Sequence, residues 1–329
     1  WVRVGYVQSN FNADNCLISG LTMDYGPFGF VEEYSPSWGM WIHAGDHFSF
    51  MNQPRAAGQN FRMFAESLLP LMDQAGKTEI QRIVDSYMTL AGDALNIMWA
   101  RKMGLLEFGP GARSILMELE GLLRQHGTDY TIFWRQLSEV PSLIWPDHAQ
   151  SLDGATAISG GTDVSVDGSN KSVLAPSEQP PTIDGDNGTY GSLETVGGSS
   201  DGKHCWREVA INETMLLDVL EFAFYKAPPS ALSQAWVTWV RRWLALASCQ
   251  GRTREEVVAG MKAANPRYVP RESMLVEAYT AAQRGDHSPL HALQALFQKP
   301  YDEQPMFGER YYRRRADGEE KQGGLGFMS

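Results

Sequence analysis

Apolar residues recur three and four positions apart between residues 60 and 125, which is the spacing of amphipathic helices. A first stripe lies between Phe61 and Met72, a second between Ile80 and Met98, and a third between Ile115 and Leu123. Thr78-Glu-Ile-Gln81 fits a capping box and therefore predicts the start of the second helix. This part of the chain is expected to form a set of packed helices.

The helical period returns downstream, and there it is rich in tryptophan. Trp236, Trp239 and Trp243 recur at helical spacing, which predicts a buried helix face, because aromatic residues at this spacing are more often core than ligand cage. Other helices are expected over Phe133–Leu137, Glu208–Phe224, Glu255–Ala264 and Glu272–Arg284. The pattern predicts a mainly α fold.

Two stretches lack a helical period. The first is rich in Gly, Pro and aromatic residues, which predicts short strands joined by tight loops, where chemistry usually lies. The second is rich in Gly, Ser, Thr, Asp and Pro and offers little apolar surface to bury, which predicts disorder. We therefore expect loops that could carry chemistry over residues 1–54, a helical region over 55–150, a disordered insertion over 151–204, a second helical region over 205–305 and a loosely structured tail over 306–329.

Composition narrows the classes of partner. With 43% hydrophobic residues, the 329-residue chain can bury a substantial core. A net charge of -11 argues against a nucleic-acid partner, because contact with phosphates needs a basic surface. No apolar run approaches the roughly 20 residues that cross a bilayer, so no membrane partner is expected. The three cysteines are not spaced like metal ligands, so no zinc site is indicated.

Acidic and amide side chains gather in the first, non-helical stretch. Asp14-Asn15 is followed by Asp24-Tyr25-Gly26. Transfer of a phosphoryl or nucleotidyl group needs oxygen ligands that hold magnesium, and a base at the acceptor hydroxyl. In protein kinases an Asp, an Asn and an Asp-Phe-Gly aspartate fill these roles, and Asp14, Asn15 and Asp24 could do so in order. Spacing alone also fits ordinary turns, since kinases separate the first Asp from the Asn.

A wider set of motifs resembles the selenoprotein O family. Val4–Asn15, Gly20–Phe30 and Asn52-Gln53-Pro54 are similar to the catalytic and metal loops of that family. The resemblance returns downstream, in the same order as in the family, in four further blocks: Asp129–Leu137, Asn265–Val269, Gly285-Asp286 and Pro300–Pro305. It covers nearly the whole chain apart from the predicted insertion.

The resemblance implies a protein adenylyltransferase, which moves AMP from ATP to Ser, Thr or Tyr hydroxyls of protein substrates. The fold implied is the C-lobe of an α+β protein-kinase-like fold, with ATP reversed relative to kinases. By motif position, Asp14 would be the base, and Asn15 and Asp24 would bind Mg2+, or alternatively Mn2+, with Asp24 thereby also holding ATP. Eukaryotic relatives are typically mitochondrial, so that compartment is expected for a eukaryotic source and the cytoplasm otherwise.

The resemblance also has gaps. Many relatives have His-Gly where this chain has Gln8-Ser9, and Asn10-Phe11 is unusual, so loop geometry or substrate preference is expected to differ. Only the C-terminal half of the family is matched, so the glycine-rich segment, lysine and arginines that hold phosphates are expected before residue 1, and the fragment alone is expected to be inactive. Relatives often end in cysteine or selenocysteine and two serines, which could follow Ser329, although a natural ending there fits as well.

Two other functions remain open at this point. A non-catalytic interaction protein could keep the same fold. Loss of Asn15 or Asp24 would favour this alternative, but both residues are present. A true phosphotransferase fits the Asp-Asn-Asp set equally well, because these residues bind the metal but do not determine which phosphate of ATP is attacked.

Overall fold

The computed structural model describes residues 1–23, 26–40, 45–144 and 212–315. The predicted insertion therefore lies outside the described residues. Near the N-terminus, β1 (Tyr6–Gln8) and β2 (Phe28–Phe30) pair antiparallel, with Tyr6 opposite Phe30 and Gln8 opposite Phe28. Short 3-10 turns lie in the same part of the chain: η1 (Val2–Val4), η2 (Ala13–Asn15) and η4 (Phe50–Asn52). The prediction of short strands joined by tight loops is confirmed for this region.

The remaining described elements are helical, so the predicted mainly α fold is confirmed. The first group comprises α1 (Gln53–Leu68), η5 (Leu69–Leu71), α2 (Gln74–Lys102), α3 (Pro110–Gln125), α4 (Tyr130–Leu137) and α5 (Val140–Ile144). The second group comprises α6 (Glu213–Leu220), η6 (Glu221–Ala223), α7 (Ser230–Ser248), α8 (Arg254–Ala264), α9 (Glu272–Gln283), α10 (Ser288–Phe297) and α11 (Pro305–Tyr311). No described helix is both long and apolar enough for a membrane span.

Two details of the helix predictions are wrong. The second helix begins at Gln74, because the carboxylate of Asp73 accepts a bond of 2.8 Å from the Gly76 amide and caps it there. Thr78 therefore lies inside α2, where its hydroxyl donates to the Gln74 carbonyl. In addition, the first residues of the predicted loose tail form α11, because Tyr311 is buried in an apolar cluster with side chains of α9 and α10.

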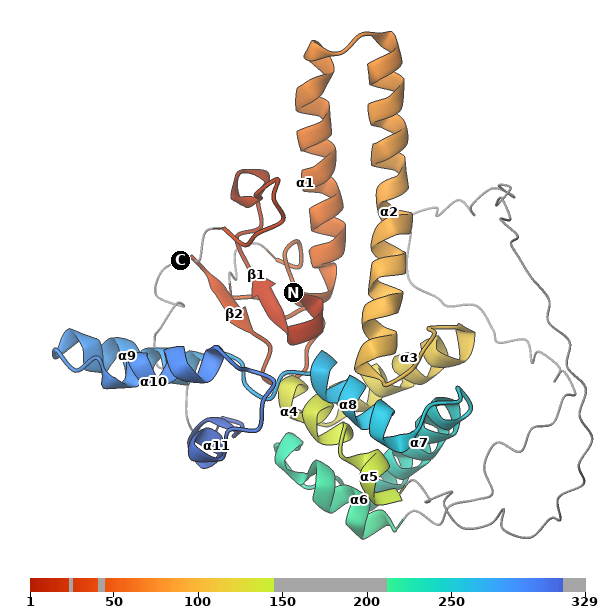
Figure 1. Cartoon of the computed structure of the whole chain (residues 1–329), viewed down its shortest axis with the longest axis vertical. Coiled ribbons are helices and arrows are strands. Elements are labelled where there is room, and N and C mark those ends of the chain that lie inside the picture. The colour runs from red at the N-terminus through yellow and green to blue at the C-terminus, as the bar shows by residue number, and fades with distance from the viewer. Residues whose placement is uncertain (24–25, 41–44, 145–211, 316–329) are drawn as a thin grey trace, which may run out of the picture. The chain divides into compact units, whose positions relative to one another are not determined.

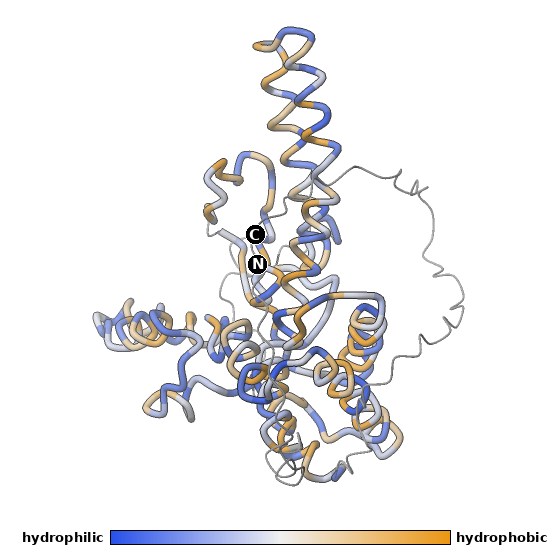
Figure 2. The backbone as a smooth tube through the Cα atoms, turned by 45° about the vertical axis from the view of Figure 1, so that its right-hand side comes forward, coloured by the Kyte–Doolittle hydropathy of each residue, from blue (hydrophilic) through white to orange (hydrophobic). Residues whose placement is uncertain are grey.

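Helices α1 and α2 lie side by side as a long antiparallel hairpin (Figure 1). Both are amphipathic, as predicted, and Figure 2 shows hydrophobic and hydrophilic residues mixed along their length. Towards the turn, however, each helix packs mainly against the other, and several apolar side chains stay exposed, such as Met63, Leu71, Met88 and Leu90. Periodicity predicted the helices, but it did not predict how much of each stripe is covered.

The tryptophan face of α7 is buried, as predicted. The helix packs on α3, and the indole nitrogen of Trp239 donates to the Ile115 carbonyl at 2.8 Å. The indole nitrogen of Trp243 donates to the Met103 carbonyl, also at 2.8 Å. The rings of Trp239 and Trp243 therefore contribute apolar area without the cost of an unpaired donor, whereas the buried indole nitrogen of Trp236 has no hydrogen-bond partner among the described residues.

A buried lysine joins the last turn of α2 to the N-terminal segment. The Lys102 ammonium donates to the Arg3 carbonyl and to Asn265 Oδ1, both at 2.8 Å. It also lies 4.7 Å from the centre of the Trp134 ring. No carboxylate of the described residues forms an ion pair with it, and burial, together with the nearby Arg3 charge, lowers the pKa of Lys102 well below its ordinary value.

This burial predicts a pH-dependent contribution to stability. Between the lowered pKa in the folded state and about 10.5 in the unfolded state, the unfolded chain binds more protons, so stability rises with pH. The free energy of unfolding of the wild type should therefore increase relative to Lys102→Met as the pH is raised from 7 towards 10, measured by urea titration. A pH-independent difference between the two proteins would contradict this.

Candidate active site

A buried glutamine fixes the start of the predicted catalytic loop. Gln53 is the first residue of α1, and its side-chain oxygen accepts a hydrogen bond of 3.0 Å from the backbone amide of Gln8. Its own side-chain nitrogen donates to the carbonyls of Tyr6, at 2.9 Å, and Phe50, at 3.1 Å. One side chain thus satisfies three backbone groups and holds β1 against the helix that follows the loops.

Gln53→Ala should therefore destabilise the protein. The change leaves buried backbone donors and acceptors without their partner, which typically costs about 1–3 kcal/mol of unfolding free energy. Thermal and urea unfolding would measure this. As a control, Gln81→Ala removes an exposed glutamine that bonds only to Asp85 among the described residues, and should leave stability nearly unchanged. Equal stability of the two variants would contradict the role of Gln53.

Asp14 and Asn15 lie together in the turn η2. The side-chain nitrogen of Asn15 donates to the Asn10 carbonyl at 2.9 Å. Asn60, on α1, donates to the Phe11 carbonyl at 2.8 Å and ties the same loop to the helix. The Asp14 side chain is exposed, so it is accessible to an incoming hydroxyl group. The structure therefore holds the backbone of the loop and leaves its carboxylate open to solvent.

The segment that leads into the predicted metal loop is anchored next to this turn. Asp24 and Tyr25 lie outside the described residues, but the residues before them are placed. Cys16, directly after Asn15, forms an antiparallel bridge with Thr22. The side-chain nitrogen of Gln8 donates to the Met23 carbonyl at 3.1 Å. The structure thus brings the chain that leads into Asp24 beside the chain that leaves Asn15.

The donor set fits magnesium in its chemistry. The side-chain nitrogen of Asn15 donates its hydrogen bond to the Asn10 carbonyl. The side-chain oxygen of Asn15 is therefore the atom of that amide group that could face a cation. Amide and carboxylate oxygens are the ligands that Mg2+ prefers. Within the described ranges, no group of three or more His, Cys, Asp or Glu side chains could hold a metal. A site there would accordingly depend on Asn15, Asp24 and the phosphates of a bound nucleotide.

A buried ion network anchors the far end of β2. The Arg271 guanidinium donates two bonds to the Asp129 carboxylate, at 2.6 and 3.0 Å, and lies 3.5 Å from Glu32. Arg271 and Asp129 are both almost fully buried. Burial raises the pKa of Glu32 despite its neighbour Arg271, because desolvation is the larger effect. The network ties the segment after the metal loop to the start of α4 and of α9.

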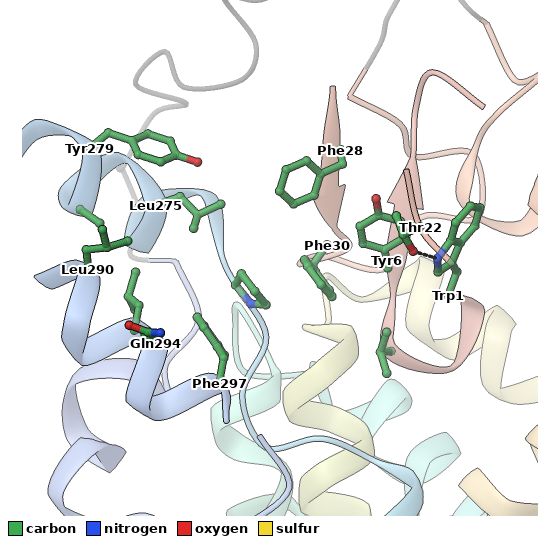
Figure 3. A pocket seen from close by; sticks show the side chains of 14 residues that line it. Trp1, Tyr6, Thr22, Phe28, Phe30, Leu275, Tyr279, Leu290, Gln294 and Phe297 are labelled. Carbon is green, nitrogen blue, oxygen red and sulfur yellow. Dashed lines mark hydrogen bonds between the residues drawn. The ribbon is translucent and has the colours of Figure 1, made fainter. Parts of the chain in front are cut away.

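An apolar cavity of about 510 Å3 lies beside the sheet. Tyr6, Phe28 and Phe30 line one wall, and side chains of α9 and α10 line the other. Figure 3 shows Phe28 and Phe30 pointing from β2 towards the helices that carry Leu275 and Phe297, with the bond from the Trp1 indole to Thr22 at the edge. The cavity therefore opens directly beside the residues that follow the predicted metal loop.

The structure shows which side chains hold the segment around the predicted site residues, and the sequence indicates only some of them. Asp14 and Asn15 come together as expected from their adjacency. In the sequence Gln8 stands out only as a departure from the relatives, yet its side chain bonds to the Met23 carbonyl just before Asp24. Gln53 stands out in the sequence only as part of a matched block, and Asn60 does not stand out at all, because the sequence of an amphipathic helix rarely indicates the partners of its polar residues.

Comparison with known proteins decides the family. A model of the family described as "Protein adenylyltransferase SelO" matches residues 1–298. The chain belongs to the SelO family. The match includes β1, the turn with Asp14 and Asn15, β2 and most of the described helices, so the family resemblance indicated by the sequence motifs is confirmed.

Several bacterial SelO relatives are similar along the whole chain. A protein of Azoarcus sp. (strain BH72) named "Protein nucleotidyltransferase YdiU" is 28% identical over 333 residues, covering 100% of this chain and 50% of the relative. Proteins with the same name from Flavobacterium johnsoniae, 27% identical, and Nitrosospira multiformis, 29% identical, cover 100% and 95% of this chain and 50% and 48% of themselves. The chain thus spans about half the length of the curated relatives that it matches.

Proposed function

We propose that this chain is the catalytic portion of a protein adenylyltransferase that transfers AMP from ATP to Ser, Thr or Tyr hydroxyls. The observation that carries the proposal is the family match over residues 1–298, which includes Asp14 and Asn15 in one anchored turn. The names of the relatives, all protein nucleotidyltransferases, support the reaction class. The fold proposed for the complete protein is kinase-like, with the described helices as part of its C-lobe.

The proposed chemistry is an in-line displacement at the α-phosphorus of ATP. The acceptor hydroxyl oxygen forms a bond to that phosphorus, the bond from the phosphorus to the bridging oxygen breaks, and pyrophosphate leaves. Asp14 accepts the hydroxyl proton, a role that its exposed position in η2 supports. Asn15 and Asp24 would hold Mg2+, or Mn2+, which when bound neutralises charge on the phosphates.

Labelled ATP separates this function from its alternatives. The complete protein is incubated with Mg2+, acceptor proteins and ATP labelled at either the α- or the γ-phosphate. Incorporation of the α label into protein is expected. Incorporation of the γ label instead would indicate a phosphotransferase, and no incorporation of either would indicate a non-catalytic interaction protein.

A further inference from the structure

The apolar cavity lies beside β2, the strand that follows the predicted metal loop in the sequence. Phe28 and Phe30 follow Asp24 by four and six residues and line the cavity from the sheet side. Leu275 and Leu290 face them from α9 and α10 (Figure 3). Leu290 is 47% exposed, so this wall is open to solvent. A concave apolar surface of this size can take a large apolar side chain.

A second hollow, of about 300 Å3, continues from the first and is acidic. The two share Phe28, Phe30, Pro270 and Leu275, so they are adjacent along β2 and the start of α9. Three carboxylates line the second hollow, those of Glu32, Glu33 and Glu272, against one guanidinium, that of Arg315.

The acidic hollow keeps charge available for a partner. Arg271 lies 3.5 Å from Glu32 and offsets its charge. Glu33 is exposed and Glu272 is half-buried, and neither forms a salt bridge within the described residues. Among the described strands only β1 pairs with β2, so no other strand covers the edge of β2. The groove formed by the two hollows is therefore apolar at one end and negatively charged at the other.

We propose that this groove binds the segment of a protein substrate that flanks the acceptor hydroxyl, and that it selects an apolar side chain next to a basic one. The inference rests on the proposed function, which requires a protein segment to pass close to Asp14 and the metal loop. Apolar lining selects an apolar side chain, and the surplus of carboxylates selects a basic one by charge complementarity. Because β2 begins four residues after Asp24 in the chain, the groove is close in sequence to the predicted metal loop.

Peptide binding to the complete protein tests this directly. Fluorescent peptides carry one tyrosine acceptor flanked by leucine and arginine; in two matched peptides either the leucine becomes asparagine or the arginine becomes glutamate. Fluorescence anisotropy then gives a Kd for each peptide without any need for catalysis. The leucine–arginine peptide is expected to bind most tightly.

Variants on each end of the groove sharpen the test. Leu290→Gln should weaken binding of the leucine–arginine peptide about tenfold, because the apolar contact is lost. Glu272→Lys should weaken it about fivefold and should bind the glutamate peptide more tightly than the wild type does. A folding defect cannot produce such a gain. Leu71→Gln and Glu66→Lys are the matched controls, since both residues are exposed and lie outside the groove.

The outcomes of the two proposals are separable. Equal Kd values for the three peptides, or no effect of Leu290→Gln and Glu272→Lys beyond their controls, would overturn the groove even if the wild type transfers AMP. Failure of the wild type to incorporate the α label would refute the transfer reaction, whereas the peptide Kd values would still show whether the groove selects apolar and basic residues.

Discussion

Asp24→Ala is expected to reduce AMP transfer by at least about a thousandfold in the complete protein. Loss of a metal ligand removes the charge that stabilises the phosphates in the transition state. Stability should change little, because a carboxylate in a glycine-rich loop adds no apolar area to the core. Incorporation of the α label from ATP measures transfer, and thermal unfolding measures stability.

Asp14→Ala offers a contrast that separates the two roles. A missing base should slow transfer while Mg2+-dependent ATP binding persists, whereas Asp24→Ala should weaken both. Asp46→Ala, at an exposed aspartate in the same N-terminal region, serves as the control and should retain full transfer. Near-normal transfer by Asp24→Ala would refute the metal assignment, and equal loss of ATP binding in Asp14→Ala would indicate a structural or metal role for Asp14.

Arg271→Met is expected to destabilise the protein by about 3–5 kcal/mol. It leaves the Asp129 carboxylate buried without its bidentate partner, which is far more costly than losing an exposed ion pair. Arg82→Met, which breaks the exposed pair with Glu79, is the matched control and should leave the free energy of unfolding unchanged. Urea unfolding at neutral pH measures both.

A second variant identifies the cause of that loss. Asp129 also caps α4, because its Oδ1 accepts a bond from the Ile132 amide at 2.9 Å. Asn at this position keeps a cap but carries no charge. The double variant Arg271→Met with Asp129→Asn should therefore be more stable than Arg271→Met alone. If the double variant is less stable than Arg271→Met, the loss of unfolding free energy in Arg271→Met arises from lost packing of the arginine and not from an unpaired buried charge.

Much of the fold could be predicted from the sequence. Helical periods predicted α1, α2, α3 and α7, and the tryptophans of α7 are buried as expected. These features depend on residues that are near one another in the chain, so a local pattern carries them. Adjacency alone brings Asp14 and Asn15 into one turn, and ordered family motifs indicated their chemistry.

Only the tertiary structure decided what holds those residues in place. Arg271 pairs with Asp129 across 142 positions, and Gln53 reaches Gln8 across 45. Such pairs form only when loop closure brings distant segments together and burial removes water from them. The local spacing of apolar residues therefore does not predict them. The groove beside β2 has the same origin, since its two walls come from opposite ends of the chain. The sequence alone determined the helices and the reactive residue types, while long-range packing determined their anchoring and the surface next to them.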